Sequence, residues 1–123
     1  MGETVRVVNR TRDSVLGDRI ALARTPWTRL VGLLGRDGLE AGGGMWLEPC
    51  DSVHMLFMRF PLDIVFVDAA GTVVDVVAGL KPWRVTWPRA GARATLELPV
   101  GAVARTGTRP GDILTCEVPC ASS

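Results

Sequence analysis

The stretch that decides the fold is VHMLFMRFPLDIVFVD, which runs from Val53 to Asp68. Apolar residues occupy both sets of alternate positions, which is typical of strands that are covered on both faces. The sequence Phe60-Pro61-Leu62 lies in the middle and predicts a turn between two antiparallel strands. We therefore predict a buried hairpin, with strands at 53–58 and 62–67.

The charged residues of this stretch predict the register of that hairpin. A three-residue loop sets Arg59 opposite Asp63 and His54 opposite Asp68. Cross-strand pairs of opposite charge contribute about 0.2–1 kcal/mol each, and a two-residue loop would destroy both matches. A contact between residues 59 and 63 would support the three-residue register, and its absence would reject it.

The same polar residues allow two interpretations. In the first, the two pairs only neutralise charge and fix the strand register. In the second, His54, Arg59, Asp63 and Asp68 line a ligand pocket at the sheet edge, because a histidine near a carboxylate can act as acid or base and an arginine can bind an anion. No serine or cysteine has the G-x-S-x-G context of an activated nucleophile.

Working outward, the segment after the first strands predicts a short helix over 26–34. Thr25 suits its N-cap, Pro26 its first position, and Gly35 its C-terminal end. Its apolar stripe should pack on the sheet and leave Arg29 and Arg36 near the pocket rim.

The remaining segments predict strands. These are expected at 5–8, 14–23, 45–47, 72–78, 94–98 and 113–118. Residues 38–44 predict a glycine-rich turn, 68–72 a tight turn, and 99–106 a short helical turn ending at Gly107. Residues 80–88 predict an irregular crossing, from which Trp83 could flank the pocket opening. We expect a mainly β domain, a barrel or two-layer sandwich of about 7–9 strands with one short α-helix near 26–34.

Composition restricts the possible partners. The 123 residues predict a single domain spanning 1–123, and a net charge of +1 argues against nucleic acid or a membrane surface as partner. No signal peptide or membrane span is evident, which predicts a cytoplasmic protein. Cys50 and His54, together with Cys116 and Cys120, make a nominal zinc set with unusual spacing, so we expect free thiols, no metal and no cofactor.

The motifs carry a family resemblance. RLVGLLGR at 29–36, GMWLEP at 44–49, the 53–68 stretch, LELPVGAVARTG at 96–107 and RPGDIL at 109–114 occur in that order. Together they resemble the prokaryotic family of domain of unknown function 192, over about residues 4–118. The resemblance implies a mostly β domain with a short helix after the second strand, and it implies no assigned activity.

The resemblance also identifies a set of recurrent positions without chemical roles. They are Arg29, Gly32, Gly35, Arg36, Met58, Arg59, Pro61, Asp63, Asp68, Gly71, Leu98, Pro99, Gly101, Gly111 and Asp112. Separately, residues 98–118 are similar in pattern to the last part of the swapped-hairpin transcription regulators. The near-zero net charge argues against DNA binding here.

Three functions remain open. The first is a non-enzymatic domain that binds a small molecule or a protein partner near the 53–68 hairpin, with Arg29, Arg36 and Trp83 at the pocket rim. The second is an enzyme that uses His54 with an acidic partner as general acid or base. The third is an interaction module, which would show an exposed apolar patch in place of a cleft. The oligomeric state stays open.

Overall fold

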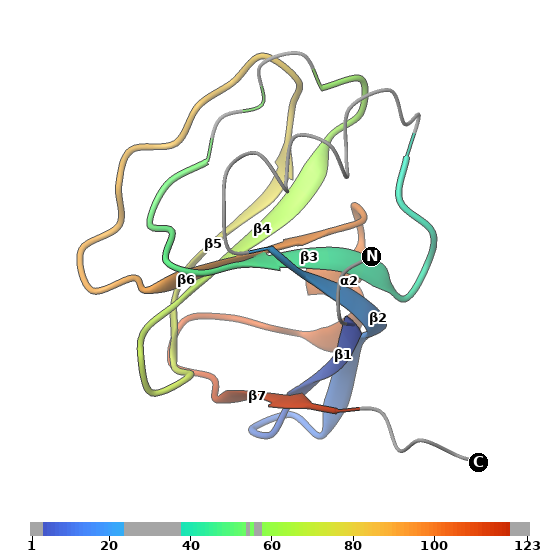
Figure 1. Cartoon of the computed structure of the whole chain (residues 1–123), viewed down its shortest axis with the longest axis vertical. Coiled ribbons are helices and arrows are strands. Elements are labelled where there is room, and N and C mark those ends of the chain that lie inside the picture. Colours follow the sequence, from blue (N-terminus) through green and yellow to red (C-terminus); the bar gives the residue numbers. More distant parts are fainter. Residues whose placement is uncertain (1–3, 24–37, 54, 56–57, 119–123) are drawn as a thin grey trace.

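A computed structural model describes residues 4–23, 38–53, 55 and 58–118. This part of the chain contains seven strands and one short helix (Figure 1). The elements are β1 (Thr4–Asn9), β2 (Ser14–Ala23), β3 (Gly43–Leu47), β4 (Leu62–Val67), β5 (Val73–Leu80), β6 (Ala94–Leu98), α2 (Ala102–Thr106) and β7 (Leu114–Glu117). None of the helical structure described in these residues is long and apolar enough to cross a membrane.

The seven strands form one curled sheet in the order β5-β4-β6-β3-β2-β1-β7. Neighbouring strands are antiparallel except β2 and β3, which run parallel. At one end the two edges of the sheet meet, because the Val73 N–H donates to Asp112 O at 2.8 Å and the Leu114 N–H donates to Gly71 O at 2.8 Å. The result is a half-barrel, which confirms the predicted mainly β class.

Gly71 permits this meeting of the edges. Its φ of 92° is left-handed, and a Cβ at this position would lie 2.6 Å from the carbonyl oxygen of Leu114. Gly71 also belongs to the tight turn predicted over 68–72, in which the Asp68 N–H donates to Thr72 O. The close contact explains why a residue without a side chain stands here.

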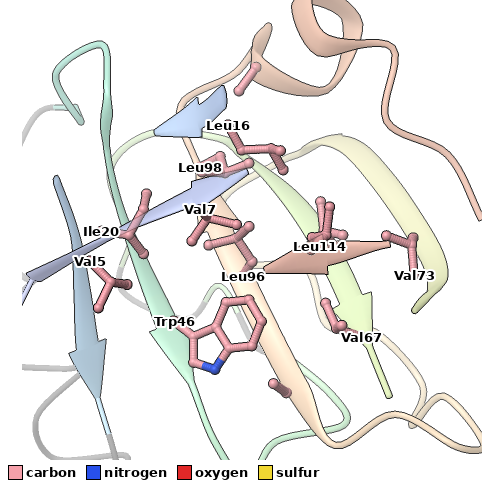
Figure 2. Packing of buried hydrophobic residues seen from close by; sticks show 13 residues of the cluster. Val5, Val7, Leu16, Ile20, Trp46, Val67, Val73, Leu96, Leu98 and Leu114 are labelled. Carbon is pink, nitrogen blue, oxygen red and sulfur yellow. The ribbon is translucent and has the colours of Figure 1, made fainter. Parts of the chain in front are cut away.

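Two apolar clusters cover the two faces of the sheet. Inside the curl, side chains from all seven strands pack together around Leu96 and Trp46 (Figure 2). The other face carries Ile64 and Phe66, which pack with apolar residues of the 53–60 segment. All six residues of β4 are buried, as expected for a strand covered on both sides.

The predicted hairpin of 53–58 with 62–67 is wrong. β4 pairs with β5 on one edge and with β6 on the other, so Asp63 lies opposite Leu98 and not opposite Arg59. Val53 and Met55 instead form hydrogen bonds with the 83–86 segment. For example, the Thr86 N–H donates to Val53 O at 2.8 Å. The described apolar residues of the 53–60 segment, at 53, 55, 58 and 60, pack on a sheet face and do not pair with β4.

Other predictions have mixed outcomes. The helix at 26–34 lies outside the described residues. The helical turn predicted before Gly107 is confirmed as α2, which ends at Gly107 with a φ of 70°. The glycine-rich segment is partly strand, since β3 begins at Gly43, and the irregular course predicted after Leu80 is confirmed.

Candidate functional site

The predicted site residues lie in different surroundings. His54, Arg29 and Arg36 fall outside the described residues, so the enzyme that would use His54 stays a prediction. Arg59 is exposed. Trp83 is also exposed, and it is hydrogen-bonded to the covering segment, since its N–H donates to Met55 O at 2.7 Å.

Asp63 holds three segments of the chain together. It stands in β4 and is only 1% exposed. Its Oδ1 accepts the Gly79 N–H at 2.8 Å, and its Oδ2 accepts the N–H groups of Gly101 and Val103 at 3.1 and 3.0 Å. A buried carboxylate is stable only when such donors replace water. Asp63 therefore joins β5 and the start of α2 to β4.

Asp68 stabilises the turn that follows β4. Its Oδ1 accepts the N–H groups of Ala70 and Thr72, both at 2.9 Å, which is the usual task of an aspartate in a tight turn. Asp63 lies at the start of β4 and Asp68 just beyond its end, so the two carboxylates serve separate backbone structures. Their role in ligand binding stays a prediction.

A second buried carboxylate, Asp112, lies where the sheet edges meet. It is 3% exposed, and its Oδ2 accepts from Asn9 Nδ2 at 2.9 Å, from Arg12 Nε at 3.0 Å and from the Arg109 N–H at 3.1 Å. Burial by itself raises the pKa of Asp112, but these hydrogen bonds and the Arg12 charge outweigh it and hold the pKa below its ordinary value.

Glu97 is a buried acid that the sequence analysis did not single out. It lies in β6, is fully buried, and stands opposite Met45 in β3 and Ile64 in β4. This register places it on the sheet face that the 53–60 segment covers. A single glutamate in a strand is usually exposed to water. Glu97 is buried because other residues cover its face of the sheet, and the sequence does not reveal this cover.

The surface beside the covering segment carries three exposed apolar side chains. Trp83, Val85 and Trp87 are 60%, 64% and 84% exposed, and we call them the tryptophan strip. Between them, Thr86 turns inward and its Oγ1 accepts the Val53 N–H at 2.8 Å. In Figure 1 this segment is the orange connection between β5 and β6. The signal in the sequence was the W-R-V-T-W pattern, of which the prediction used only Trp83.

Basic residues surround the tryptophan strip. Four of them and no acidic residue lie between positions 81 and 93. Arg89 donates from Nε to Asp75 Oδ2 at 2.7 Å and lies 5.0 Å above the Phe66 ring, while Arg93 approaches Glu48. Lys81 and Arg84 are exposed and have no acidic partner within the described ranges.

The cysteines carry no metal centre in the described part of the chain. Cys50 and Cys116 are free thiols, and Cys50 Sγ donates to Ser52 O at 3.0 Å. The described residues contain no group of three or more histidine, cysteine, aspartate or glutamate side chains that could hold a metal ion. The other two members of the nominal zinc set, His54 and Cys120, lie outside these residues.

Comparison with solved structures supports the fold. A candidate transcription regulator from Sinorhizobium meliloti superposes with a TM-score of 0.78 at 27% identity, covering 94% of both chains. A protein of unknown function from Novosphingobium aromaticivorans has a TM-score of 0.74 at 32% identity, covering 91% of this chain and 83% of that one. The half-barrel is therefore shared with experimentally determined structures.

Comparison with curated sequences identifies the family. A UPF0127 protein of Thermococcus sibiricus is 30% identical over 117 residues, which cover 91% of this chain and 75% of that protein. A UPF0127 protein of Pyrococcus horikoshii is 46% identical over 50 residues, 41% of this chain and 43% of that one. The profile of DUF192, an uncharacterized family, matches residues 7–116, and the chain therefore belongs to the DUF192 family, as its ordered motifs predicted.

Proposed function

We propose that this protein is a non-enzymatic binding domain that docks an acidic, partly apolar segment of a protein partner on the tryptophan strip. The observation that carries the proposal is the exposure of two tryptophans and a valine within five residues. Together they expose on the order of 400 Å², which is the size of the functional patches of soluble monomers.

The type of residue supports a protein partner. Tryptophan and arginine are enriched at the energetic centres of protein interfaces, where a large rigid side chain enters a pocket of the partner. Trp83 and Arg84 are adjacent here, and both are exposed. Water contact with this much aromatic surface is unfavourable for the isolated domain, and a partner would remove it.

The charges support an acidic segment. Lys81 and Arg84 are exposed beside the strip without a carboxylate partner in the described residues. Positive groups at the rim attract acidic side chains, accelerate association and exclude basic segments. The chain carries a net charge of only +1, so this preference is local to the strip.

The backbone holds the strip in place before any partner arrives. Met55 exchanges two hydrogen bonds of 2.7 Å with the 83–84 backbone, and three hydrogen bonds join Thr86 to Val53. A surface held in this way loses little conformational entropy on binding, which favours affinity.

A peptide library provides the test. A random 12-residue display library is selected on the wild type and counter-selected on the Trp83→Ser/Trp87→Ser double variant. The proposal expects enriched peptides that combine acidic and apolar residues. Peptides that bind both proteins equally, or a selection for basic sequences, would contradict it.

The affinity of one enriched peptide for each variant then measures how much Trp87 and Arg84 contribute to binding. Trp87→Ser should weaken binding by about thirtyfold, as expected for a central aromatic residue, and Arg84→Gln by about fivefold at low salt. The matched control is Val118→Ser, which removes a similarly exposed apolar side chain just after β7 and should change nothing.

A further inference from the structure

A depression away from the tryptophan strip has the dimensions of a ligand site. Its volume is about 700 Å³, within the usual range of roughly 300–1,000 Å³ for small-molecule sites. It lies where β2, the 41–42 turn and the segment that leads into α2 meet. The lining residues that matter are Arg6, Arg19, Arg105, Leu16, Val100 and Asp18.

Arg105 is the best placed cation of this depression. Its Nη1 donates to Val15 O at 3.1 Å and its Nη2 to Leu16 O at 3.2 Å, which fixes the guanidinium against β2. A guanidinium has five N–H donors, so donors remain for a ligand. No carboxylate neutralises Arg105 among the residues that the structure describes.

Arg19 is fixed in a similar way. Its Nη2 donates to Ala41 O at 2.7 Å. Two carboxylates lie near it, Asp18 at 3.5 Å and Glu40 at 3.4 Å, and their side chains are 65% and 83% exposed. Ion pairs this exposed are weak, so a bound anion can compete with them.

Arg6 shares its acidic partner with a second arginine. Both Arg6 and Arg10 bond to Glu117, so a single carboxylate faces two guanidinium groups. The lining of the depression itself contains three arginines, Arg6, Arg19 and Arg105, and one carboxylate, Asp18. The balance favours an anionic ligand over a cationic one.

The remaining lining is apolar. Leu16 is buried, while Val15 and Val100 are exposed at 39% and 55%. The start of α2 does not supply the anion site, because the N–H groups of Gly101 and Val103 already bond to Asp63. A ligand that satisfies both parts of the lining combines an anionic group with an apolar body.

We propose that this depression binds a small organic anion, a carboxylate or a phosphate ester on an apolar body, with Arg105 and Arg19 as its principal contacts. The site is separate from the tryptophan strip and does not depend on it. A guanidinium suits either anion, because its planar donors match the oxygens of both.

Four probes test the proposal by calorimetric titration of the whole protein. Phenyl phosphate and benzoate carry both features, inorganic phosphate lacks the apolar body, and benzyl alcohol lacks the charge. The proposal expects phenyl phosphate or benzoate to bind at least about tenfold more tightly than either partial probe. The tighter of the two identifies phosphate or carboxylate as the preferred group. Equal binding of all four, or no binding, would overturn it.

Two variants place the binding. Arg105→Gln removes the fixed cation, and Val100→Glu adds a repelling charge without touching an arginine contact. Both should weaken the better probe by about tenfold or more, while Arg93→Gln and Val118→Glu, the matched surface controls, should leave it unchanged. Amide shifts of Gly17 and Gly42 in the NMR spectrum should follow the titration. Binding that survives both lining variants would contradict the assignment.

Discussion

Two regions of the molecule reverse the usual distribution of polar and apolar side chains. The carboxylates of Asp63 and Asp112 are almost fully buried, at 1% and 3% exposure. The indoles of Trp83 and Trp87 lie on the surface, at 60% and 84% exposure. Each arrangement is unfavourable by itself.

The buried acids are compensated inside the protein. Each accepts three hydrogen bonds from described donors, so the structure accounts for their burial without a ligand. The exposed tryptophan surface, in contrast, stays in contact with water, which is unfavourable for an apolar side chain. The comparison teaches that hydrogen bonds within the protein account for the burial of Asp63 and Asp112, whereas the tryptophan strip is the surface on which we propose that a partner docks.

The largest effect is expected for Asp63→Ala. Removing the carboxylate leaves three backbone N–H groups of β5 and α2 without their acceptor, which should lower the free energy of unfolding by about 3–4 kcal/mol. Urea denaturation followed by circular dichroism measures it.

Asp68→Ala is the matched comparison for that experiment. It also removes an acceptor from backbone N–H groups, but Asp68 is only half-buried and water can replace it. We expect a loss of about 1 kcal/mol. Equal losses for the two variants would mean that burial does not set the importance of these acids.

The second effect is a pH dependence that originates at Asp112. Its pKa is lower in the folded protein than in the unfolded chain, so the unfolded state takes up the proton first as the pH falls. The stabilisation is therefore complete above the ordinary pKa of about 3.8 and is lost as the pH falls from there through the lower folded value.

Asp112→Asn tests this dependence. The variant should be less stable than the wild type near neutral pH, by about 1–2 kcal/mol, and the difference should shrink as the pH falls below the ordinary carboxyl range. Thermal midpoints measured across the acidic range provide the comparison. A difference that stays constant down to the lowest pH would show that Asp112 does not titrate as proposed.

Much of the fold could be predicted because local patterns determine it. The strands that became β2, β4 and β6, the turn at Gly71 and the helical turn before Gly107 each follow from residue type and spacing. The pairing of the 53–60 segment could not be predicted. An apolar run has the same pattern whether it pairs with the next strand or covers a sheet, and only long-range contacts such as Met55 with Arg84 decide.

The candidate site was predictable only in part. Trp83 was identified as a possible pocket residue, but Trp87, four residues further along, was not singled out, because exposure has no signature in sequence. Asp63 and Asp68 were singled out as polar residues in an apolar stretch, but the predicted pairing of Asp63 with Arg59 was wrong. Asp68 bonds within its own turn, but the donors to Asp63 are the backbone N–H groups of Gly79, Gly101 and Val103, which are distant in the chain and leave no trace in the sequence.

The smallest effect concerns the backbone beneath the tryptophan strip. Trp83 has a φ of 70°, a left-handed conformation that costs an ordinary residue about 1 kcal/mol. Trp83→Gly and Trp83→Ala both remove the indole and its contacts, so their difference isolates the backbone. The glycine variant should be the more stable by about 1 kcal/mol, measured as the difference in urea midpoints.

Trp87 is the control, at which we expect the opposite stability difference between the glycine and alanine variants. The reason is that Trp87 is not among the described residues with positive φ. At this position glycine gains no conformational advantage and only increases the entropy of the unfolded chain, so Trp87→Gly should be less stable than Trp87→Ala by about 0.5–1 kcal/mol. Opposite signs at two tryptophans four residues apart would show that the segment is held in one defined conformation. The same sign at both would contradict a fixed left-handed Trp83, and with it the rigid presentation on which the proposed docking depends.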